Sequence, residues 1–217
     1  MHQSLDEVIN LLESQGYSIK DPWNIVDIFE KKVAEYAGSR YAVSVDNCTN
    51  ALFLCLRYLK ASETVTIPSK TYISVPQTII HAGCNLVFEN IEWSGTYQLE
   101  PYPIIDGATR FRKDMYISGT YQCLSFHIKK ILNIGKGGMI LTDDSTAARW
   151  FKVARYEGRH IGIPYDEDEI ELIGWNMYMP PEQAARGIMI FESLSDYNHD
   201  CGGSWKYRDI SQTKVFK

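Results

Sequence analysis

Tyr41-Ala42-Val43-Ser44-Val45-Asp46-Asn47-Cys48-Thr49-Asn50 joins a short apolar strand directly to the start of a helix that continues to Leu59. A strand that ends on a helix start exposes free backbone N–H groups at the positive end of the helix dipole. Such a helix start favours an anion, for example a phosphate group. The simpler interpretation is that Thr49 or Asn50 only caps the first turn of the helix.

The same alternation continues along the chain. Apolar runs at 64–67, 85–88, 103–106, 121–126 and 139–142 predict strands, and helical periodicity covers 25–37, 72–81, 145–156 and 181–194. Strands that alternate with helices predict an α/β fold, in which a mostly parallel central sheet carries helices on both faces. We expect a domain over 1–195 with an N-terminal helical part at 1–38, and an irregular C-terminal arm at 196–217.

The composition is that of an ordinary globular chain. It has 217 residues, 45% hydrophobic and 23% charged, with a net charge of -5 that argues weakly against a nucleic-acid partner. No apolar run is long enough for a membrane span, and the start lacks the regions of a signal peptide. The five cysteines show no zinc spacing. We therefore expect a cytoplasmic protein without a metal, a nucleic acid or a membrane partner.

A second stretch, Ser125-Phe126-His127-Ile128-Lys129-Lys130, is followed by Gly135-Lys136-Gly137-Gly138. A serine five residues before a lysine, with glycines beyond, suggests a lysine presented from tight backbone beside an anion. That arrangement suits a lysine amine that reacts with pyridoxal phosphate. Lysine-rich glycine turns are also common on protein surfaces, so this stretch alone does not decide between the two interpretations.

Two further side chains follow predicted strands. Tyr72 comes after the strand at 64–67, where an aromatic ring could stack on a flat heterocycle or simply be a half-buried helix residue. Asp106 ends the strand at 103–106, where a carboxylate is costly to bury without a partner. A protonated pyridine nitrogen is such a partner, and a helix N-cap is the simpler alternative.

In order and spacing these stretches resemble the DegT/DnrJ-type sugar aminotransferases, pyridoxal-phosphate enzymes of the aspartate aminotransferase fold (fold type I). The matching stretches lie within residues 23–194, at 29–38, 45–52, 68–72, 105–108, 125–130, 137–144 and 174–185. The resemblance implies a fold like the large domain of fold-type I enzymes, and pyridoxal 5'-phosphate as the cofactor.

The resemblance also implies a site. The catalytic group would be Lys130, which carries the cofactor as an aldimine and moves the proton. The cofactor-binding residues would be Thr49, Asn50, Tyr72, Asp106, Thr109, Ser125 and Asn176. Of the two adjacent lysines, the spacing from Ser125 selects Lys130, and neighbours in an extended chain point to opposite sides.

Each of these residues has a part in the implied site. The phosphate would be held by Thr49, Asn50 and Ser125. The ring would stack on Tyr72, and its nitrogen would pair with Asp106. Thr109 stands where the family usually has Gln or His near the ring hydroxyl. Asn176 would reach the phosphate bound in the partner subunit, across the interface of a homodimer with shared sites.

The chain departs from the family in two places. The tract at 89–103 is short where the family has a strand, a helix and a further linker. After residue 194 the family continues into a C-terminal small domain, which is largely missing here. The resemblance is therefore to a shortened form, in which the predicted cofactor residues are present and the substrate enclosure is reduced.

The expected function is transfer of an amino group from glutamate to a keto-sugar nucleotide. Candidates for contacts with the substrate carboxylate or diphosphate are Arg110, Arg112, Arg155, Arg159 and His160, against the alternative that each is a solvated surface charge. Two other functions remain open: a catalytically weak or inactive protein that binds the cofactor or a sugar nucleotide, and a partner subunit of a longer aminotransferase.

Overall fold

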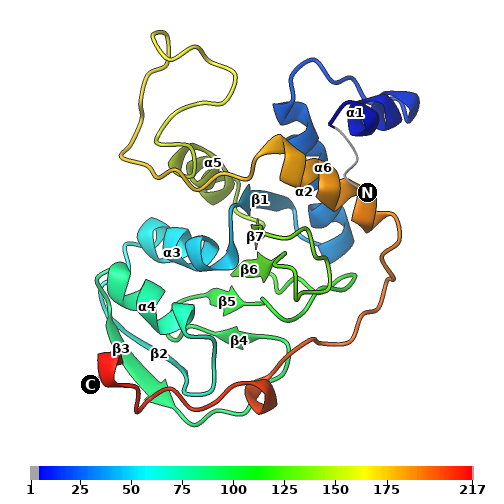
Figure 1. Cartoon of the computed structure of the whole chain (residues 1–217). Coiled ribbons are helices and arrows are strands. Elements are labelled where there is room, and N and C mark those ends of the chain that lie inside the picture. Colours follow the sequence, from blue (N-terminus) through cyan, green and yellow to red (C-terminus); the bar gives the residue numbers. More distant parts are fainter. Residues whose placement is uncertain (1–4, 217) are drawn as a thin grey trace.

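A computed structural model describes residues 5–216 of the chain (Figure 1). Its strands form one sheet in the order β1-β7-β6-β5-β4 and a second sheet of β2 and β3. The strands are β1 Tyr41–Val45, β2 Thr64–Pro68, β3 Asn85–Glu89, β4 Tyr97–Gln98, β5 Ile104–Asp106, β6 Tyr121–Ser125 and β7 Gly138–Thr142. The α-helices are α1 Leu5–Ser14, α2 Trp23–Ala37, α3 Cys48–Tyr58, α4 Ser74–His81, α5 Ser145–Ala154 and α6 Pro181–Phe191.

The two sheets are joined into one layer through Glu100. The amide of Thr66 in β2 donates to the carbonyl of Glu100 at 2.8 Å, and the amide of Glu100 donates back to Thr66 at 3.1 Å. Glu100 follows β4 closely, so the short tract between β3 and β5 occupies the place between β5 and β2. This tract is where the sequence predicted no strand, and β4 is the element that the sequence analysis missed.

The strands of the sheet run in both directions. β5 pairs with β6 in parallel, β7 is antiparallel to both of its neighbours, and β4 is antiparallel to β5. β1, β5 and β6 therefore point the same way, and the antiparallel bridge of Thr66 to Glu100 gives β2 and its parallel neighbour β3 that direction too. Of the five strand pairings among the described residues, two are parallel and three are antiparallel, so the sheet is mixed where the sequence predicted a mostly parallel one.

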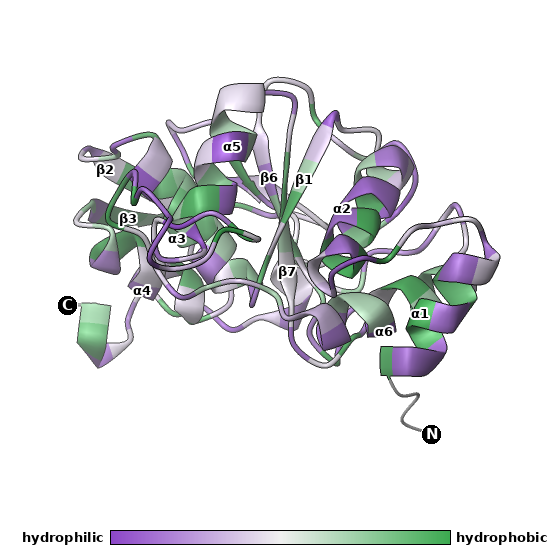
Figure 2. Cartoon of the chain, turned by 90° about the horizontal axis from the view of Figure 1, so that it is seen from above, coloured by the Kyte–Doolittle hydropathy of each residue, from purple (hydrophilic) through white to green (hydrophobic). Residues whose placement is uncertain are grey.

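Alternate strand residues face two separate hydrophobic cores. Val43 of β1 and Ile140 of β7 belong to one core, with side chains of α3, α4 and α5. Ala42 and Leu141 point to the other face, where they join side chains of α1, α2 and α6. Figure 2 shows the two groups of helices on opposite sides of the sheet. The α/β class with helices on both faces is thus confirmed, since successive strand residues alternate between faces.

The start of α3 differs in detail from the sequence prediction. The cap is Asn47, whose extended backbone precedes the helix and whose side chain accepts from the Asn50 amide at 2.9 Å. The cap expected at Thr49 or Asn50 is therefore wrong by a few residues. Both residues lie inside the first turn, at the end of the helix that directly follows β1.

The last part of the described chain, from residue 196 to 216, contains two 3-10 helices, η1 Ser204–Lys206 and η2 Lys214–Phe216. We call this segment the arm; it runs in orange and red past β4 towards β3 (Figure 1). Across residues 5–216, no helix combines the length and the apolar character needed to cross a membrane.

Candidate functional site

Most of the predicted site residues lie at one edge of the sheet. β1, β2, β5 and β6 share a direction, so their carboxyl ends meet at this edge, which we call the carboxyl edge. The pairing register places Val45, Gly138 and Ser125 side by side across β1, β7 and β6. Asp106 ends β5 at the same edge. The topology thus brings together segments that are up to 93 residues apart in the sequence, from Val45 to Gly138.

The start of α3 offers hydrogen-bond donors at this edge. Within the described chain, the backbone amides of Cys48 and Thr49 have no hydrogen-bond partner, whereas the Asn50 amide is taken by the cap. A Cβ atom at Gly138 would lie 2.5 Å from the backbone carbon of Asn47, so only glycine lets β7 pass so close to the helix start. The free amides and the helix dipole form a cradle for an anion.

The side chains around this cradle are partly engaged with one another. Thr49 Oγ1 lies 2.7 Å from Ser74 Oγ, and Asn50 Nδ2 donates to Asp46 Oδ1 at 2.7 Å. Ser125 Oγ accepts a long bond of 3.4 Å from the His127 amide, which leaves its own hydrogen to donate. The structure therefore brings the three predicted phosphate residues to the cradle, and it adds the Cys48 amide, which the sequence analysis missed.

Asp106 is buried at the end of β5, with 6% of its surface exposed. Its Oδ1 accepts from the Ala108 amide at 2.9 Å, and its Oδ2 accepts from the Tyr97 hydroxyl at 2.7 Å. Burial raises the pKa of this carboxyl group, while those two donors and the nearby positive charge of Lys130 act to lower it. A buried carboxylate thus lies within reach of the charge of Lys130 at the carboxyl edge.

The two adjacent lysines sit in a turn. The Lys130 amide donates to the His127 carbonyl at 2.8 Å, and the chain from His127 is not extended, so the geometric reason given for choosing between the lysines was wrong. The turn still separates them. Lys129 is exposed, whereas the charge of Lys130 is close enough to act on Asp106 and Cys48. Lys130 therefore remains the candidate lysine of the site.

Aromatic side chains from three segments lie near Tyr97, the hydrogen-bond donor to Asp106, or near Tyr207. Tyr72, predicted to stack on a ring, is 59% exposed. Tyr207 of the arm is half-buried, and burial, with the charges of Asp106 and other neighbours, raises its pKa to about 12. Its ring stacks on Trp93 at 5.8 Å with an interplanar angle of 20°, and Trp93 in turn lies 4.7 Å from Tyr97. Trp93 and Tyr97 lie in a tract without periodicity, so no sequence signal marked them.

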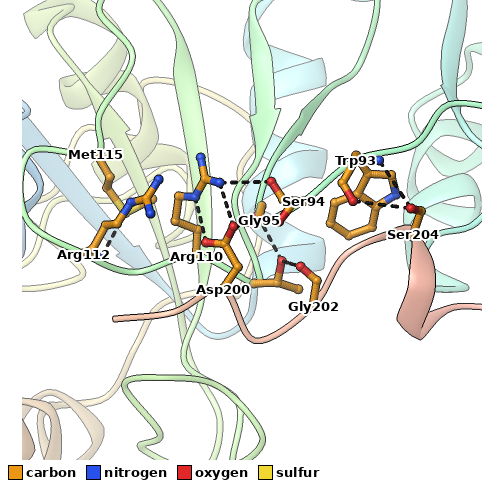
Figure 3. Close-up of polar contacts among 10 residues, drawn as sticks. Trp93, Ser94, Gly95, Arg110, Arg112, Met115, Asp200, Gly202 and Ser204 are labelled. Atoms are coloured by element: carbon orange, nitrogen blue, oxygen red, sulfur yellow. Dashed lines mark hydrogen bonds and ion pairs between the residues drawn. The ribbon is translucent and has the colours of Figure 1, made fainter. Parts of the chain in front are cut away.

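Thr109 lies in a different environment from the one that the resemblance implied. Its side chain is 3% exposed, and its hydroxyl is placed to donate to the carbonyls of Gly95 at 3.0 Å and Gly202 at 2.9 Å (Figure 3). The Cys201 amide donates to the Thr109 carbonyl at 2.8 Å. The Thr109 hydroxyl thus links the arm to the short tract. In this geometry the hydroxyl is not available to a ligand.

The arm and the short tract bind each other across the carboxyl edge. The Ser204 amide donates to the Trp93 carbonyl at 3.0 Å, next to the bonds of Arg110 with Asp200 (Figure 3). Farther along, the Ile210 amide donates to the carbonyl of Ser69 at 3.0 Å, directly after β2. The short tract and the arm therefore cover the edge together.

The arginines proposed for substrate contacts already have partners within the chain. Arg110 is paired with Asp200, Arg159 with Asp168, and Arg155 with Glu30. Arg155 is only 2% exposed, so the alternative of a solvated charge was wrong for it. The fourth, Arg112, lies 5.4 Å over the ring of Tyr197.

Three of the basic candidates border a cavity of about 500 Å³ between α2 and α5: Arg155, Arg159 and His160. The cavity also touches Tyr41, at the start of β1, whereas the predicted cofactor residues follow the end of β1. A hydrogen bond to Asp168 raises the pKa of His160. These residues therefore gather at a place other than the anion cradle.

Asn176 is exposed, and its side-chain amide donates to Glu157 Oε1 at 2.9 Å. Its neighbour Met177 accepts from the Asp46 amide at 2.9 Å. The loop that carries Asn176 thus runs beside the turn between β1 and α3, with the side chain directed to Glu157.

Comparison with known proteins gives a single family. The chain matches the DegT/DnrJ/EryC1/StrS aminotransferase family over residues 2–117 and 107–201. The spore coat polysaccharide biosynthesis protein SpsC of Bacillus subtilis is 29% identical over 89% of this chain and 62% of its own length. A GDP-perosamine synthase of Caulobacter vibrioides is 25% identical over 78% of this chain and 57% of its own length.

Solved structures show the same fold. PseC of Helicobacter pylori, an aminotransferase involved in pseudoaminic acid biosynthesis, superposes with a TM-score of 0.68 at 18% identity, over 89% of this chain and 63% of its own. DesI, solved in the presence of its TDP-sugar product, superposes with a TM-score of 0.63 at 22% identity, over 88% of this chain and 58% of its own.

The chain spans about three fifths of the length of the curated relatives it matches, 62% and 57% for the two above. The alignment with SpsC covers 247 positions, more than the 217 residues of the chain, so the relative contains segments that this chain lacks.

Proposed function

The chain belongs to the DegT/DnrJ/EryC1/StrS aminotransferase family, whose members use pyridoxal phosphate, and we propose that it transfers an amino group from glutamate to a keto-sugar nucleotide. The observation that carries this proposal is the buried carboxylate of Asp106, placed close to the amine of Lys130 beside an anion cradle. A carboxylate, a lysine and a phosphate site at one sheet edge are the groups that this cofactor requires.

The residues present fit the cofactor. The free amides of Cys48 and Thr49 suit its phosphate, and the close passage of Gly138 leaves the helix start uncovered by a side chain. The buried Asp106 is a partner for a protonated ring nitrogen, since a buried carboxylate is stabilised by a positive charge. The exposed ring of Tyr72 is free to stack.

When bound, pyridoxal phosphate supplies an electron-withdrawing ring that stabilises negative charge on the substrate carbon. In this proposal Asp106 holds a proton on the ring nitrogen by its charge. Lys130 would hold the cofactor through its amine and, once an incoming amine has displaced it, would take the proton from the substrate carbon and return it to the cofactor carbon on the other side of the shared nitrogen. The hydroxyls of Thr49 and Ser125 donate to the phosphate and fix the orientation of the ring.

The sugar-nucleotide part of the proposal is supported by the relatives. A GDP-perosamine synthase and a structure with a TDP-sugar product are both among them. The arm supports it as well, because Tyr207 and Ile210 lie at the carboxyl edge, where the arm would form one wall of a substrate site. We propose that Arg110 holds the arm through Asp200. Among the four candidate arginines, Arg112 is then the one without a carboxylate partner in the described chain.

We further propose a homodimer with shared sites. Asn176 is exposed on a loop beside the β1–α3 turn and is bonded to Glu157 on the surface of its own protomer. In the dimer it would face the phosphate cradle of the partner subunit, as the family resemblance implies. A C2 interface would repeat this contact in both sites.

Spectroscopy with an amino donor tests the proposal. The protein is loaded with pyridoxal phosphate and titrated with glutamate, while the visible absorbance and the release of 2-oxoglutarate are measured. The proposal predicts loss of the visible band with one equivalent of 2-oxoglutarate per site. A band that persists at saturating glutamate would overturn the transferase and favour a protein that only binds the cofactor.

A further inference from the structure

Tyr97 belongs to β4, which lies in the short tract between β3 and β5. Its hydroxyl lies between two buried groups, 2.7 Å from Asp106 Oδ2 and 2.6 Å from Thr71 Oγ1. The three residues are between 3% and 9% exposed. Neither the expected site nor the family resemblance gave Tyr97 or Thr71 a role.

Counting donors shows which hydroxyl donates each of these two hydrogen bonds. A phenol hydroxyl has one hydrogen, and Asp106 Oδ2 accepts it from Tyr97. The bond between Tyr97 and Thr71 must then be donated by the threonine hydroxyl. With the Ala108 amide on Oδ1, each carboxylate oxygen of Asp106 has one fixed donor and keeps further acceptor capacity.

Backbone pairing fixes the Tyr97 side chain over Asp106. The two residues are direct partners in the antiparallel register of β4 and β5, so their side chains lie next to each other on one face of the sheet. The ring of Trp93, 4.7 Å from that of Tyr97, packs against it. The hydroxyl is therefore held in place before any ligand arrives.

The electrostatics of Asp106 depend on a small set of neighbours. The titratable groups that face it are Tyr97 on β4, Lys130 after β6, Cys48 on α3, Cys123 on β6 and Tyr207 on the arm. Burial raises the pKa of Asp106, and the Tyr97 hydroxyl is among the donors that oppose this. Burial, with the charge of Asp106, raises the pKa of Tyr97 well above its usual range, so Tyr97 stays protonated and keeps its role as donor.

We propose that Tyr97 is a positioning residue, which orients the carboxylate of Asp106 and keeps it ionised to pair with the ring nitrogen of the cofactor. This inference rests on the proposed function. Tyr97 acts through Asp106, and Thr71 fixes the lone pairs of Tyr97 so that its hydrogen points at the carboxylate. The short tract of this chain thus supplies a residue to the cofactor site while it also closes the sheet.

The test uses Tyr97→Phe, which removes only the hydroxyl. We expect its affinity for pyridoxal phosphate, measured by the visible band and by quenching of tryptophan fluorescence, to fall about tenfold or more, the cost of one hydrogen bond to a charged group. The pH below which the cofactor dissociates should also move upward, because Asp106 then takes up a proton more readily. Thr71→Val should shift both readouts in the same direction by a smaller factor.

Tyr102→Phe is the matched control, since Tyr102 lies in the same tract and its hydroxyl accepts from the amides of Ser62 and Glu63. It should leave the affinity and the pH dependence unchanged, and thermal unfolding of each variant verifies that it folds. Equal affinity and equal pH dependence in Tyr97→Phe and the unchanged protein would overturn the inference but leave the proposed function standing. Absence of any cofactor band in the unchanged protein would overturn both.

Discussion

The guanidinium of Arg110 donates two hydrogen bonds to the carboxylate of Asp200, from Nε to Oδ1 at 2.8 Å and from Nη2 to Oδ2 at 2.7 Å. The pair joins the segment after β5 to the arm, which lies 90 residues later in the chain. Ser94 of the short tract donates to the same carboxylate at 2.9 Å. Asp200 is thus the point at which the arm, the short tract and the β5 segment are tied together (Figure 3).

Asp200→Ala should loosen the arm. The two side chains are 21% and 12% exposed, so the bidentate pair is partly shielded from solvent and we expect it to contribute about 1–2 kcal/mol to local stability. The arm contains Lys206, Arg208 and Lys214. Limited digestion with trypsin should therefore cut the arm of the variant about tenfold faster.

Asp196→Ala serves as the control for that experiment, because the pair of Asp196 with Lys113 is exposed at 75% and 52%. It should be digested like the unchanged protein. If both variants are cut at the same rate, the Arg110–Asp200 pair does not hold the arm.

Arg155→Met should be strongly destabilising. Arg155 is buried against Glu30 and the carbonyl of Ser44, so its loss leaves the Glu30 carboxylate buried with only Lys152 as a counter-charge. We expect a loss of about 3–5 kcal/mol in the free energy of unfolding, measured with urea. Arg149→Met, which breaks a pair in which Arg149 is 73% exposed, should stay within about 0.5 kcal/mol. Equal effects of the two variants would contradict the structural role of Arg155.

The same pair predicts how stability depends on pH. Burial acts to raise the pKa of Glu30, but the charges of Arg155 and Lys152 and the Ser44 amide outweigh it, so the net pKa is below the ordinary value of 4.5. A carboxyl group with a lowered pKa stabilises the fold above its unfolded value and loses that contribution as the pH falls through the folded value. The stability difference between the unchanged protein and Glu30→Gln should therefore be constant above pH 5 and shrink below about 4.5. Urea unfolding from pH 7 to pH 3 measures it, and a difference that is independent of pH would be the contrary result.

Shared sites predict complementation between two variants. Asn176→Ala lacks the residue offered to the partner, and Lys130→Ala lacks the lysine of its own site. In a mixed dimer, one site is complete, because it combines Lys130 of the Asn176→Ala chain with Asn176 of the Lys130→Ala chain. A mixture refolded together should recover about a quarter of the cofactor signal of the unchanged protein, given random pairing. Recovery no greater than the sum of the separate variants would show that the sites are not shared.

The sequence predicted those parts of the fold that rest on local pattern. The strand at 41–45, the helix after it and the alternation of strands with helices are all present, because burial on both faces of the sheet leaves apolar runs that are visible in the sequence. β4 was missed because two residues show no periodicity, and their pairing depends on β5. The relative direction of neighbouring strands depends on how they are connected and paired, so no single segment of the sequence shows it.

The site was predictable only in part, for a similar reason. Asp106, Ser125 and the start of α3 follow predicted strands, so their meeting at one edge follows from the α/β alternation. The positions of Tyr97 and Tyr207 depend on how the short tract and the arm fold back, and this is set by contacts such as Trp93 with Tyr207 that no pattern records. Burial of Arg155 likewise depends on Glu30, which lies 125 residues away in the sequence.

The most direct measurement is the absorbance spectrum of the protein mixed with pyridoxal phosphate, compared among the unchanged chain, Lys130→Ala and Lys129→Ala. Lys130 lies close enough to Asp106 to lower the pKa of that carboxyl group, whereas Lys129 is exposed. The account predicts a visible band in the unchanged chain and in Lys129→Ala, and its loss in Lys130→Ala. A band of equal strength in all three proteins, or one lost only in Lys129→Ala, would contradict it.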